Sequence, residues 1–348
     1  MMFIQLLLVL IAVIGKILES SVLYYHNNLN IIILGVSAFR PMGGRMMVKS
    51  SLSMLDGGLK APPGMKPGPD GKFKKAGEHL AEYILENENG SKALIRSYGC
   101  NVFSWIAADG TQVMGTSNDA PLGDKMDSKP HPGGAPHCFP QFGPGAILQH
   151  GFARGMKFIP EERAKKLSFD RMIFKLEPTE ETLKIWNHNF EYRVDITLRE
   201  NSLEWDVIVI NLDTQPWTCT LGLHNYFDVS SLANVVVSGA FSGADTVCKV
   251  TGATGKAASN DVKVTSAIDM LYKKVAGPVT ITDTGKKTKL TLERKGYTDT
   301  CIWSPYGHES WNYDKFICVE PVQVDPVSIP PGKFKETKFY QKVTYEKL

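Results

Sequence analysis

The chain has 348 residues, of which 43% are hydrophobic and 22% are charged; these values exclude a disordered chain, a collagen-like repeat and a membrane protein with several spans. The formal net charge is +3, and the excess of bases lies within residues 1–60, so the remainder is neutral and offers no basic surface for nucleic acid or an anionic membrane. Six cysteines without a C-x-x-C pair predict free thiols in a reducing compartment.

Residues 1–60 are predicted to form an N-terminal presequence outside the fold. The apolar run over residues 3–14 is too short to span a bilayer comfortably. Residues 40–60 are rich in Met, Ser, Gly and bases and contain a single acid, which is the composition of a transit peptide. Between them, residues 37–41 resemble the junction of bipartite presequences that deliver proteins to secondary plastids. We therefore expect a plastid location, with a cytoplasmic one as the alternative if the segment is a signal anchor or the start codon is misassigned.

Residues 61–72 are rich in proline and glycine and predict a flexible linker, so one folded domain is expected over residues 73–348. Short runs with period-two alternation, rich in Val, Ile, Thr and aromatics, recur along this domain. Helical spacing is seen over residues 76–86. The recurring strands, without alternating helices, predict an all-β fold built as an antiparallel sandwich. Strands are predicted over residues 93–98, 102–107, 167–176, 183–186, 192–198, 203–210, 218–223, 235–239, 279–282, 289–292, 316–319 and 338–344.

Three segments depart from this strand pattern. Residues 133–145 and 149–154 are rich in Gly, Pro and Phe and predict a shaped loop, which is either functional or a plug at the sandwich end. His224 follows an apolar run and, taken alone, is most simply a hydrogen-bonded core histidine. Glu320 ends another apolar run before Pro321, where partial desolvation would raise its proton affinity, although an edge residue facing water is the simpler alternative. Together they offer the aromatic surface and the acid/base pair that a sugar-like substrate needs.

These segments resemble the hexose-phosphate mutarotases of the aldose 1-epimerase superfamily, usually named glucose-6-phosphate 1-epimerases. The family pattern contains G-G-I-P-x-C-F-P-x-F-G, then Q-H-G-F/L-A-R, F-H-T-Y-F and C-V/I-E-P, followed by a Pro-Gly turn. The chain matches these motifs in the same order at residues 133–143, 149–154, 223–227, 318–321 and 331–332. The resemblance implies a β-supersandwich and an isomerase that acts on a sugar phosphate.

The resemblance also implies the roles of individual residues. His224 and Glu320 match the catalytic histidine and glutamate of the family. The substrate-binding positions are matched by Gln149, His150, Arg154 and Asp269, the last within a short I-D-M-L-Y stretch that resembles T-D-x-x-Y. No metal and no cofactor is implied. We expect a small sugar phosphate as the only partner, without nucleic acid or stable membrane association of the mature domain, and a monomer.

One departure from the family pattern bears on the substrate. The family commonly has arginine directly before Gly-Gly, where it helps to bind the phosphate, and this chain has Pro132. A fixed bidentate clamp is therefore missing at that position, and Lys125, Lys129 and His131 are the candidates to compensate for it. Asn225, in place of the usual threonine, is a milder change.

Interconversion of anomers requires the hemiacetal ring to open and close again. We expect Glu320 to remove the proton of the anomeric hydroxyl and protonated His224 to protonate the ring oxygen, with the roles reversed on closure. The two groups would face each other across a cavity with room for a pyranose.

Three alternatives stay open at the level of the sequence. The first is an aldose 1-epimerase acting on unphosphorylated hexoses, which Pro132 favours. The second is a non-catalytic carbohydrate-binding module on the same scaffold. The third is a cysteine hydrolase built on Cys138 and His150, which the sequence disfavours because Phe139 and Pro140 give the thiol no activating environment.

Overall fold

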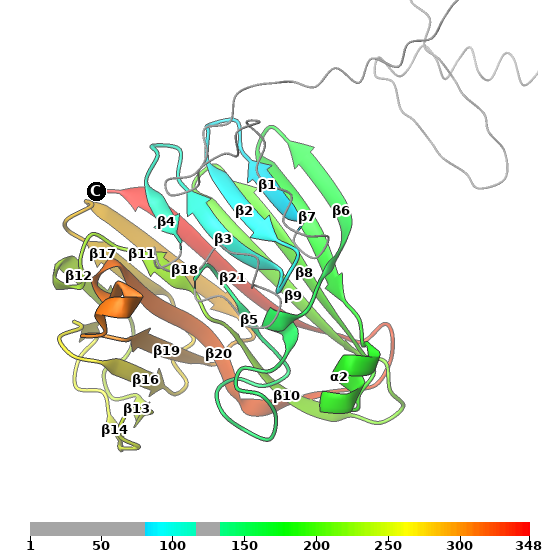
Figure 1. The fold of residues 1–348 in the computed structure, drawn as a ribbon. Helices are drawn as coiled ribbons and strands as arrows, with labels where there is room; N and C mark the ends of the chain where they lie inside the picture. Colours follow the sequence, from blue (N-terminus) through cyan, green and yellow to red (C-terminus); the bar gives the residue numbers. More distant parts are fainter. Residues whose placement is uncertain (1–80, 116–132) are drawn as a thin grey trace, which may run out of the picture. The chain divides into compact units, whose positions relative to one another are not determined.

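The computed structural model describes residues 81–115 and 133–348 (Figure 1). The predicted presequence, the predicted linker and the expected start of the domain at residue 73 lie outside the described residues. Within these two ranges, no helix combines the length and the apolar character needed to cross a bilayer.

Two antiparallel sheets make up the domain (Figure 1). The first runs in the order β1-β2-β3-β4-β11-β20-β19-β16-β13-β14, with β10 paired to β20 and β5 paired to β10. The second runs β15-β12-β17-β18-β21-β9-β8-β7-β6. The predicted all-β antiparallel sandwich is confirmed.

The strands of the first sheet are β1 (Glu82–Glu86), β2 (Lys92–Arg96), β3 (Asn101–Ile106), β4 (Gln112–Met114), β5 (His137–Cys138), β10 (Trp217–Leu223), β11 (Tyr226–Asp228), β13 (Asp245–Cys248), β14 (Thr254–Lys256), β16 (Ile268–Tyr272), β19 (Asp299–Ser304) and β20 (Phe316–Ile329). The strands of the second sheet are β6 (Ile159–Lys166), β7 (Phe169–Leu176), β8 (Phe190–Arg199), β9 (Ser202–Asn211), β12 (Val235–Ser238), β15 (Asp261–Val262), β17 (Val279–Asp283), β18 (Thr288–Lys295) and β21 (Glu336–Lys347).

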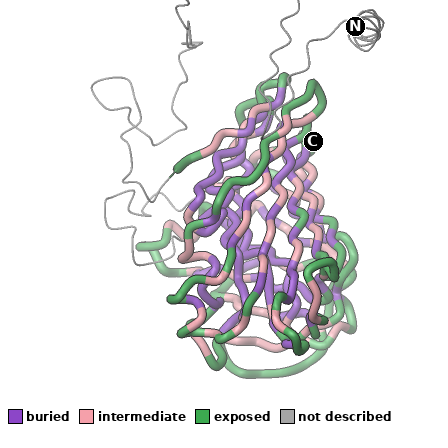
Figure 2. Tube along the Cα trace, turned by 90° about the vertical axis from the view of Figure 1, so that its right-hand side faces the viewer, coloured by how far each residue is buried: buried purple, intermediate pink, exposed green. Residues whose placement is uncertain are grey.

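The core lies between the two sheets. One cluster of buried side chains takes Trp105 and Val319 from the first sheet and Trp205 and Val343 from the second. Along β7 and β8 buried and half-buried residues alternate, as expected for strands with one face on the core. Figure 2 shows the exposed residues gathered mainly in the turns at the strand ends. Burial of the apolar face thus explains why the period-two pattern predicted most strands.

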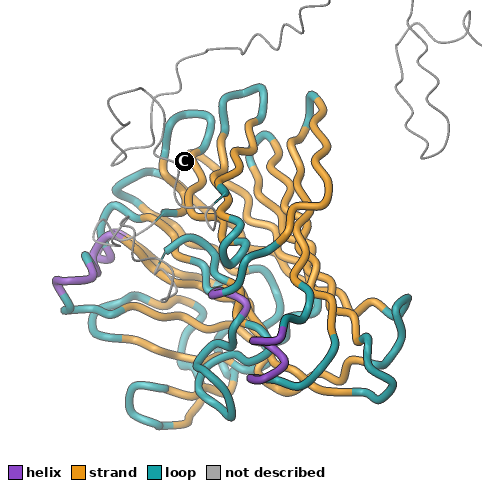
Figure 3. Tube along the Cα trace, turned by 45° about the vertical axis from the view of Figure 1, so that its right-hand side comes forward, coloured by secondary structure: helices purple, strands orange, loops and turns teal. Residues whose placement is uncertain are grey.

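Helix is confined to short segments (Figure 3), and one of them corrects a prediction. Residues 183–186 were expected to form a strand, but helix α2 (Glu180–Ile185) occupies this stretch. Thr179 and Thr182 form a reciprocal capping box, which satisfies backbone donors at the helix start. Two acids in the first turn also favour the helix N-terminus. These signals outweigh a short apolar alternation.

Two further differences concern strands. The helical spacing over residues 76–86 does not produce a helix within its described part, because Glu82–Glu86 pairs with β2 as β1. A strand was expected over residues 316–319, with Glu320 at its end before Pro321. Instead β20 continues to Ile329, and Pro321 pairs with Thr300. Glu320 therefore lies within a central strand rather than at a strand end.

Candidate active site

Strand register places His224 beside Glu320. Strands β11 and β20 pair with Tyr226 opposite Cys318. In an antiparallel pair, the residue two positions before Tyr226 lies opposite the residue two positions after Cys318, and both side chains stay on the same face. His224 therefore comes opposite Glu320. Nδ1 of His224 lies 3.3 Å from Oε1 of Glu320, and the His224 ring stacks on that of Tyr226 with 4.8 Å between centroids. The predicted convergence of imidazole and carboxyl group is therefore present.

A separation of 3.3 Å leaves no room for a pyranose between the two groups. The expectation that they face each other across a cavity is wrong, because cross-strand neighbours present their side chains to the same side of a sheet. Nδ1 of His224 and Oε2 of Glu320 make no hydrogen bond with the described residues, although both atoms are buried. Buried polar atoms are nearly always paired, so these two atoms lack the partner that such atoms usually have.

The same face of the sheet continues over β19 and β16. Cys301 lies opposite Glu320, and Trp303 lies opposite Cys318. Asp269 lies opposite Trp303 on the next strand. Because neighbouring strands are about 4.8 Å apart, Asp269 is two strands away from the acid/base pair. The predicted substrate-binding aspartate and the predicted catalytic pair thus stand at two ends of one surface.

A tightly constrained loop brings His150 to the pair. The His150 ring lies 5.4 Å from the His224 ring, measured between centroids. His150 has φ 66°, a left-handed conformation that non-glycine residues rarely adopt and that is found preferentially at functional sites. The next residue, Gly151, has φ +69°, and a Cβ there would lie 2.2 Å from the carbonyl oxygen of Phe139. Glycine is therefore required beside His150.

The thiol of Cys138 lies 3.2 Å from Nδ1 of His150, which brings together the two residues of the cysteine hydrolase alternative. Burial, however, raises the pKa of Cys138 well above its ordinary value. Burial, with the positive charges of Arg154 and Lys249, lowers the pKa of His150 to about 3. A reactive thiolate needs the opposite environment, and the contact instead fits a neutral thiol beside a neutral imidazole.

Gln149 and Arg154 flank His150. Nε2 of Gln149 lies 3.4 Å from Nε2 of His150, and Gln149 is exposed. Nη2 of Arg154 donates to the backbone oxygen of Gln149 at 2.8 Å. Nε of Arg154 is buried and makes no hydrogen bond with the described residues. The three predicted binding residues of this loop therefore lie together.

Lys249, which the sequence did not single out, joins Asp269 in the site. Its Nζ lies 3.6 Å from Oδ1 of Asp269 and 3.8 Å from Sγ of Cys301. It also lies over the Phe142 ring, 4.5 Å from the centroid. No motif around residue 249 marks it, and only the register of strands distant in sequence brings it here.

The environment changes the acidity of the His224–Glu320 pair. Burial raises the pKa of Glu320 from 4.5 to about 8, while Lys249 opposes the shift and Asp269 adds to it. Burial lowers the pKa of His224 well below its ordinary value, and the positive charges of Arg154 and Lys249 act in the same direction. Burial thus favours the neutral form of both groups, with a proton on Glu320 rather than on His224. The sequence hypothesis placed a proton on His224, where this environment disfavours it.

The group His224, Cys318 and Glu320 is also the candidate for a metal. One ligand atom from each lies within 4.8 Å of the others, and sulfur, nitrogen and oxygen together suit zinc. The nearby cations Arg154 and Lys249 oppose a metal ion here. We assign no metal to this group, and the contacts give no ground for a cofactor.

Aromatic residues of the motifs divide between core and site. Phe139, Phe152 and Phe227 belong to the main core cluster. Phe142 instead contacts the His150 ring at 5.2 Å between centroids. Trp303, which the sequence did not single out, is half-buried and has its ring 5.7 Å from that of His224. Trp303 therefore offers an apolar surface beside the acid/base pair.

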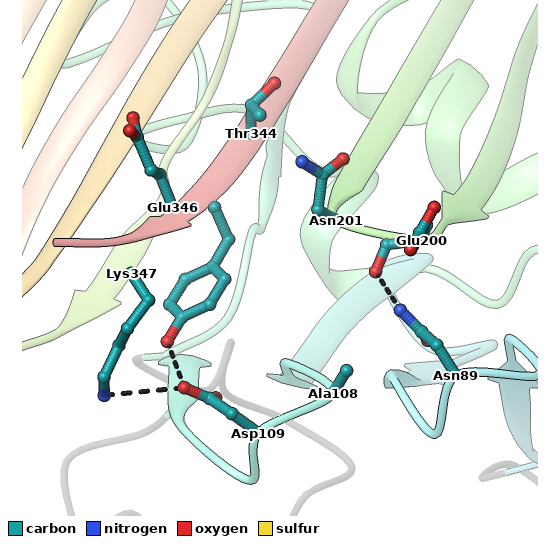
Figure 4. A pocket seen from close by; sticks show the side chains of 9 residues that line it. Asn89, Ala108, Asp109, Glu200, Asn201, Thr344, Glu346 and Lys347 are labelled. Atoms are coloured by element: carbon teal, nitrogen blue, oxygen red, sulfur yellow. Dashed lines mark hydrogen bonds and ion pairs between the residues drawn. The ribbon is translucent and has the colours of Figure 1, made fainter.

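A separate hollow of about 430 Å³ shares none of these residues (Figure 4). Its polar groups already pair with one another: the hydroxyl of Tyr345 donates to Asp109 at 2.7 Å, and Asn89 donates to the backbone oxygen of Glu200 at 2.7 Å. Lys347 lies 3.4 Å from the same Asp109 carboxylate. Among its lining residues the hollow has no histidine beside a buried carboxyl group, so it offers no acid/base pair like that of His224 and Glu320.

Pro132 and the three residues expected to compensate for it, Lys125, Lys129 and His131, lie outside the described residues. The described cations next to the His224–Glu320 pair are Arg154 and Lys249.

Comparisons with known proteins identify the family of this chain. Residues 81–340 match the family model described as aldose 1-epimerase. A Cenchrus ciliaris protein called "Putative glucose-6-phosphate 1-epimerase" is 30% identical, over 74% of this chain and 83% of that relative. A structure from Salmonella typhimurium described as a "putative mutarotase" has a TM-score of 0.70 at 23% identity and covers 78% of this chain and 92% of its own.

A galactose mutarotase related enzyme from Lactobacillus acidophilus has a TM-score of 0.63 at 20% identity, over 76% of this chain and 97% of its own. At these identities the two structures establish the shared fold. The match to the family model extends over most of the chain. The chain belongs to the aldose 1-epimerase family.

Proposed function

We propose that this protein interconverts the α and β anomers of a hexose 6-phosphate, with glucose 6-phosphate as the expected substrate. The observation that carries the proposal is the buried His224–Glu320 pair, with 3.3 Å between Nδ1 of His224 and Oε1 of Glu320. In this proposal the two groups share one proton. The name of the Cenchrus ciliaris relative supports the same reaction.

The shared proton fits a cycle of ring opening and closure. The carboxylate of Glu320 takes the proton of the anomeric hydroxyl, and the imidazolium of His224 gives a proton to the ring oxygen. At the open-chain stage Glu320 is protonated and His224 is neutral, which is the arrangement that burial favours. Rotation about C1–C2 exposes the other face of the aldehyde, and closure reverses both transfers. Hydroxyl groups of the closed sugar that donate to Glu320 would stabilise its carboxylate and return the proton to His224.

The charge of the site supports a phosphorylated substrate. Arg154 and Lys249 are the cations whose charges reach His224, while Asp269 is the nearby carboxylate and Glu320 is neutral at pH 7. A site with this excess of positive charge favours an anion. Arg154 is the residue expected to hold the phosphate, because guanidinium groups bind phosphate oxygens through paired donors.

Anomer exchange measured by NMR on the purified full chain tests the reaction. Glu320→Gln and His224→Ala should each remain folded and lose roughly 100-fold or more of the activity. His188→Ala, which removes a surface histidine paired with Asp213, serves as the matched control and should leave the rate unchanged. Full activity in either site variant would reject the assignment, and sugar binding by the unmodified protein without any turnover would favour the carbohydrate-binding alternative.

Substrate preference separates the phosphorylated from the free sugars. Glucose 6-phosphate should be exchanged faster than glucose and galactose, and Arg154→Ala should remove that preference by raising KM for the phosphate ester. Faster exchange of the free sugars, or no effect of Arg154→Ala, would favour an aldose 1-epimerase of unphosphorylated hexoses.

Delivery to a plastid is a second proposal, which rests on the composition of residues 1–60. Mass spectrometry of the N-terminus of the native protein should find it processed within or shortly after this segment. An N-terminus at residue 1 would contradict delivery by a cleaved presequence.

A further inference from the structure

We propose that Lys249 is a positioning residue for the anomer exchange: its ammonium group fixes the carboxylate of Asp269 at the edge of the sugar site and supplies a positive charge that faces Glu320. The inference rests on the proposed function, because it assigns Lys249 to the reaction of the His224–Glu320 pair.

The contact between Lys249 and Asp269 is built into the sheet. The backbone N–H of Lys249 donates to the backbone oxygen of Asp269 at 2.7 Å, so the two residues are cross-strand neighbours just beyond the end of β13. Their side chains then meet with 3.6 Å between Nζ and Oδ1. Exposed fractions of 25% for Lys249 and 29% for Asp269 leave this ion pair partly shielded from water, where such pairs are screened less than on the surface.

Two further contacts hold the ammonium group in place. It lies 4.5 Å from the centroid of the Phe142 ring, a cation–π geometry that stabilises a lysine at a partly desolvated position. It also lies 3.8 Å from Sγ of Cys301. Phe142 in turn contacts His150, so Lys249 is held between the sheet and the loop that carries His150.

Cys301 connects Lys249 to the acid/base pair. It lies opposite Glu320 on the adjacent strand, and its thiol donates to Oδ1 of Asp269 at 3.5 Å. The charge of Lys249 therefore acts on Glu320 across one intervening side chain, and it lowers the pKa of Glu320 against the effect of burial. Other titratable groups also surround Glu320. Those on the strands are Tyr226 (β11), Cys318 (β20), Cys301 (β19), Asp269 (β16) and Cys138 (β5). Those outside the strands are His224, just before β11, and His150 and Arg154, in the segment after β5.

A direct role in phosphate binding is the competing role for Lys249. The ion pair with Asp269 neutralises much of its charge, whereas Nε of Arg154 has no partner among the described residues. The structure therefore favours Arg154 as the phosphate ligand and Lys249 as the group that orders Asp269.

Lys249→Met, Lys249→Arg and the control Lys273→Met should be compared in the full chain by NMR anomer exchange with glucose 6-phosphate over a range of pH. Lys273 has a similar exposed fraction, 22%, and is paired with Asp325 at 2.6 Å, outside the site. We expect Lys249→Met to reduce kcat roughly 10- to 100-fold and to displace the alkaline limb of the pH profile to higher pH. Lys249→Arg should restore most of the rate, and Lys273→Met should match the unmodified protein.

A double-mutant cycle checks the route through Asp269. If Lys249 acts by ordering Asp269, then Asp269→Asn should cost less in the Lys249→Met background than in the unmodified chain, because the two residues act as a unit. Full additivity would overturn this route, and so would a Lys249→Met variant that raises KM for glucose 6-phosphate at unchanged kcat. Should Lys249→Met fail to fold, Lys249→Gln carries the same test.

The two proposals fail in different ways. An unmodified chain without anomer exchange rejects the proposed function. An active unmodified chain whose Lys249→Met variant keeps its rate and pH profile rejects the role of Lys249 alone.

Discussion

Replacing Glu320 with glutamine is expected to abolish activity and, as the pH rises, to stabilise the fold. Glu320 is 1% exposed, and its Oε2 makes no hydrogen bond with the described residues. Burial therefore holds the pKa at about 8, against 4.5 ordinarily. A carboxyl group whose pKa is raised on folding favours the folded state at low pH, and this contribution is lost as the pH rises from the unfolded pKa to the folded one.

The size of the effect follows from the two pKa values. Between about pH 5 and pH 8 the folded state binds nearly one more proton at Glu320 than the unfolded state does. A difference of one proton changes the free energy of unfolding by about 1.36 kcal/mol per pH unit. Over slightly less than three units the unmodified protein should therefore lose about 4 kcal/mol relative to Glu320→Gln, whose amide does not ionise.

Urea unfolding at several pH values, followed by the fluorescence of the six tryptophans, measures this difference. Subtracting the free energy of unfolding of one protein from that of the other at each pH removes the contribution of other groups that titrate in the same range. Glu346→Gln, which changes an exposed carboxylate, is the matched control, and its free energy of unfolding should vary with pH as that of the unmodified protein does. If the free energy of unfolding of Glu320→Gln also varies in this way, the carboxyl group is ionised in the folded protein at ordinary pH and the reasoning about the shared proton is refuted.

Three further outcomes are expected. The kcat/KM of the unmodified protein, measured by NMR exchange, should fall above about pH 8, where Glu320 loses the shared proton. It should persist below pH 6.5, because the pKa of His224 is lowered. An alkaline limit far from pH 8 would contradict this assignment. Asn225→Ala should cost about 1–3 kcal/mol in urea unfolding, because Asn225 donates to Val319 and Gln341 in the core and its loss leaves both acceptors unpaired. Asp170→Asn should cost about 1–3 kcal/mol, because its fully buried carboxylate accepts hydrogen bonds from the 45% exposed Arg163 and from the backbone N–H of Glu86, and an unchanged unfolding midpoint would contradict this prediction.

The fold was predictable from the sequence where burial sets the pattern. Strands such as β8 and β9 alternate between core and surface, and this alternation is visible in the residue types. The prediction was wrong where another signal dominated. The capping box at Thr179 makes α2 a helix, and pairing with β19 carries β20 through Pro321. A local pattern does not contain these tertiary effects.

The candidate site divides in a similar way. His224, Glu320 and the loop with His150 lie in motifs, so sequence comparison marks them. The motifs do not separate His150 from His137, whose Nδ1 lies 3.0 Å from the Tyr192 hydroxyl in the core. Lys249 and Trp303 lie in no motif, and their place in the site follows from the register of strands β13, β16, β19 and β20. Such non-local pairing is not readable from a single sequence.

The strand register also explains why the acid/base pair lies within a central strand rather than at the edge of the sheet. On an edge strand, Glu320 would be solvated and would ionise with an ordinary carboxyl pKa, leaving little affinity for a proton at neutral pH. Within β20, between His224 and Cys301, the same carboxyl group gives up its proton only near pH 8, close to the pH at which general acid/base catalysis is most effective. A buried carboxyl group with an unpaired oxygen destabilises the fold, but the same group would supply the acid/base chemistry. We infer that the sheet tolerates this cost because the surrounding core is large, and that replacing the carboxyl group at position 320 exchanges catalytic activity for stability.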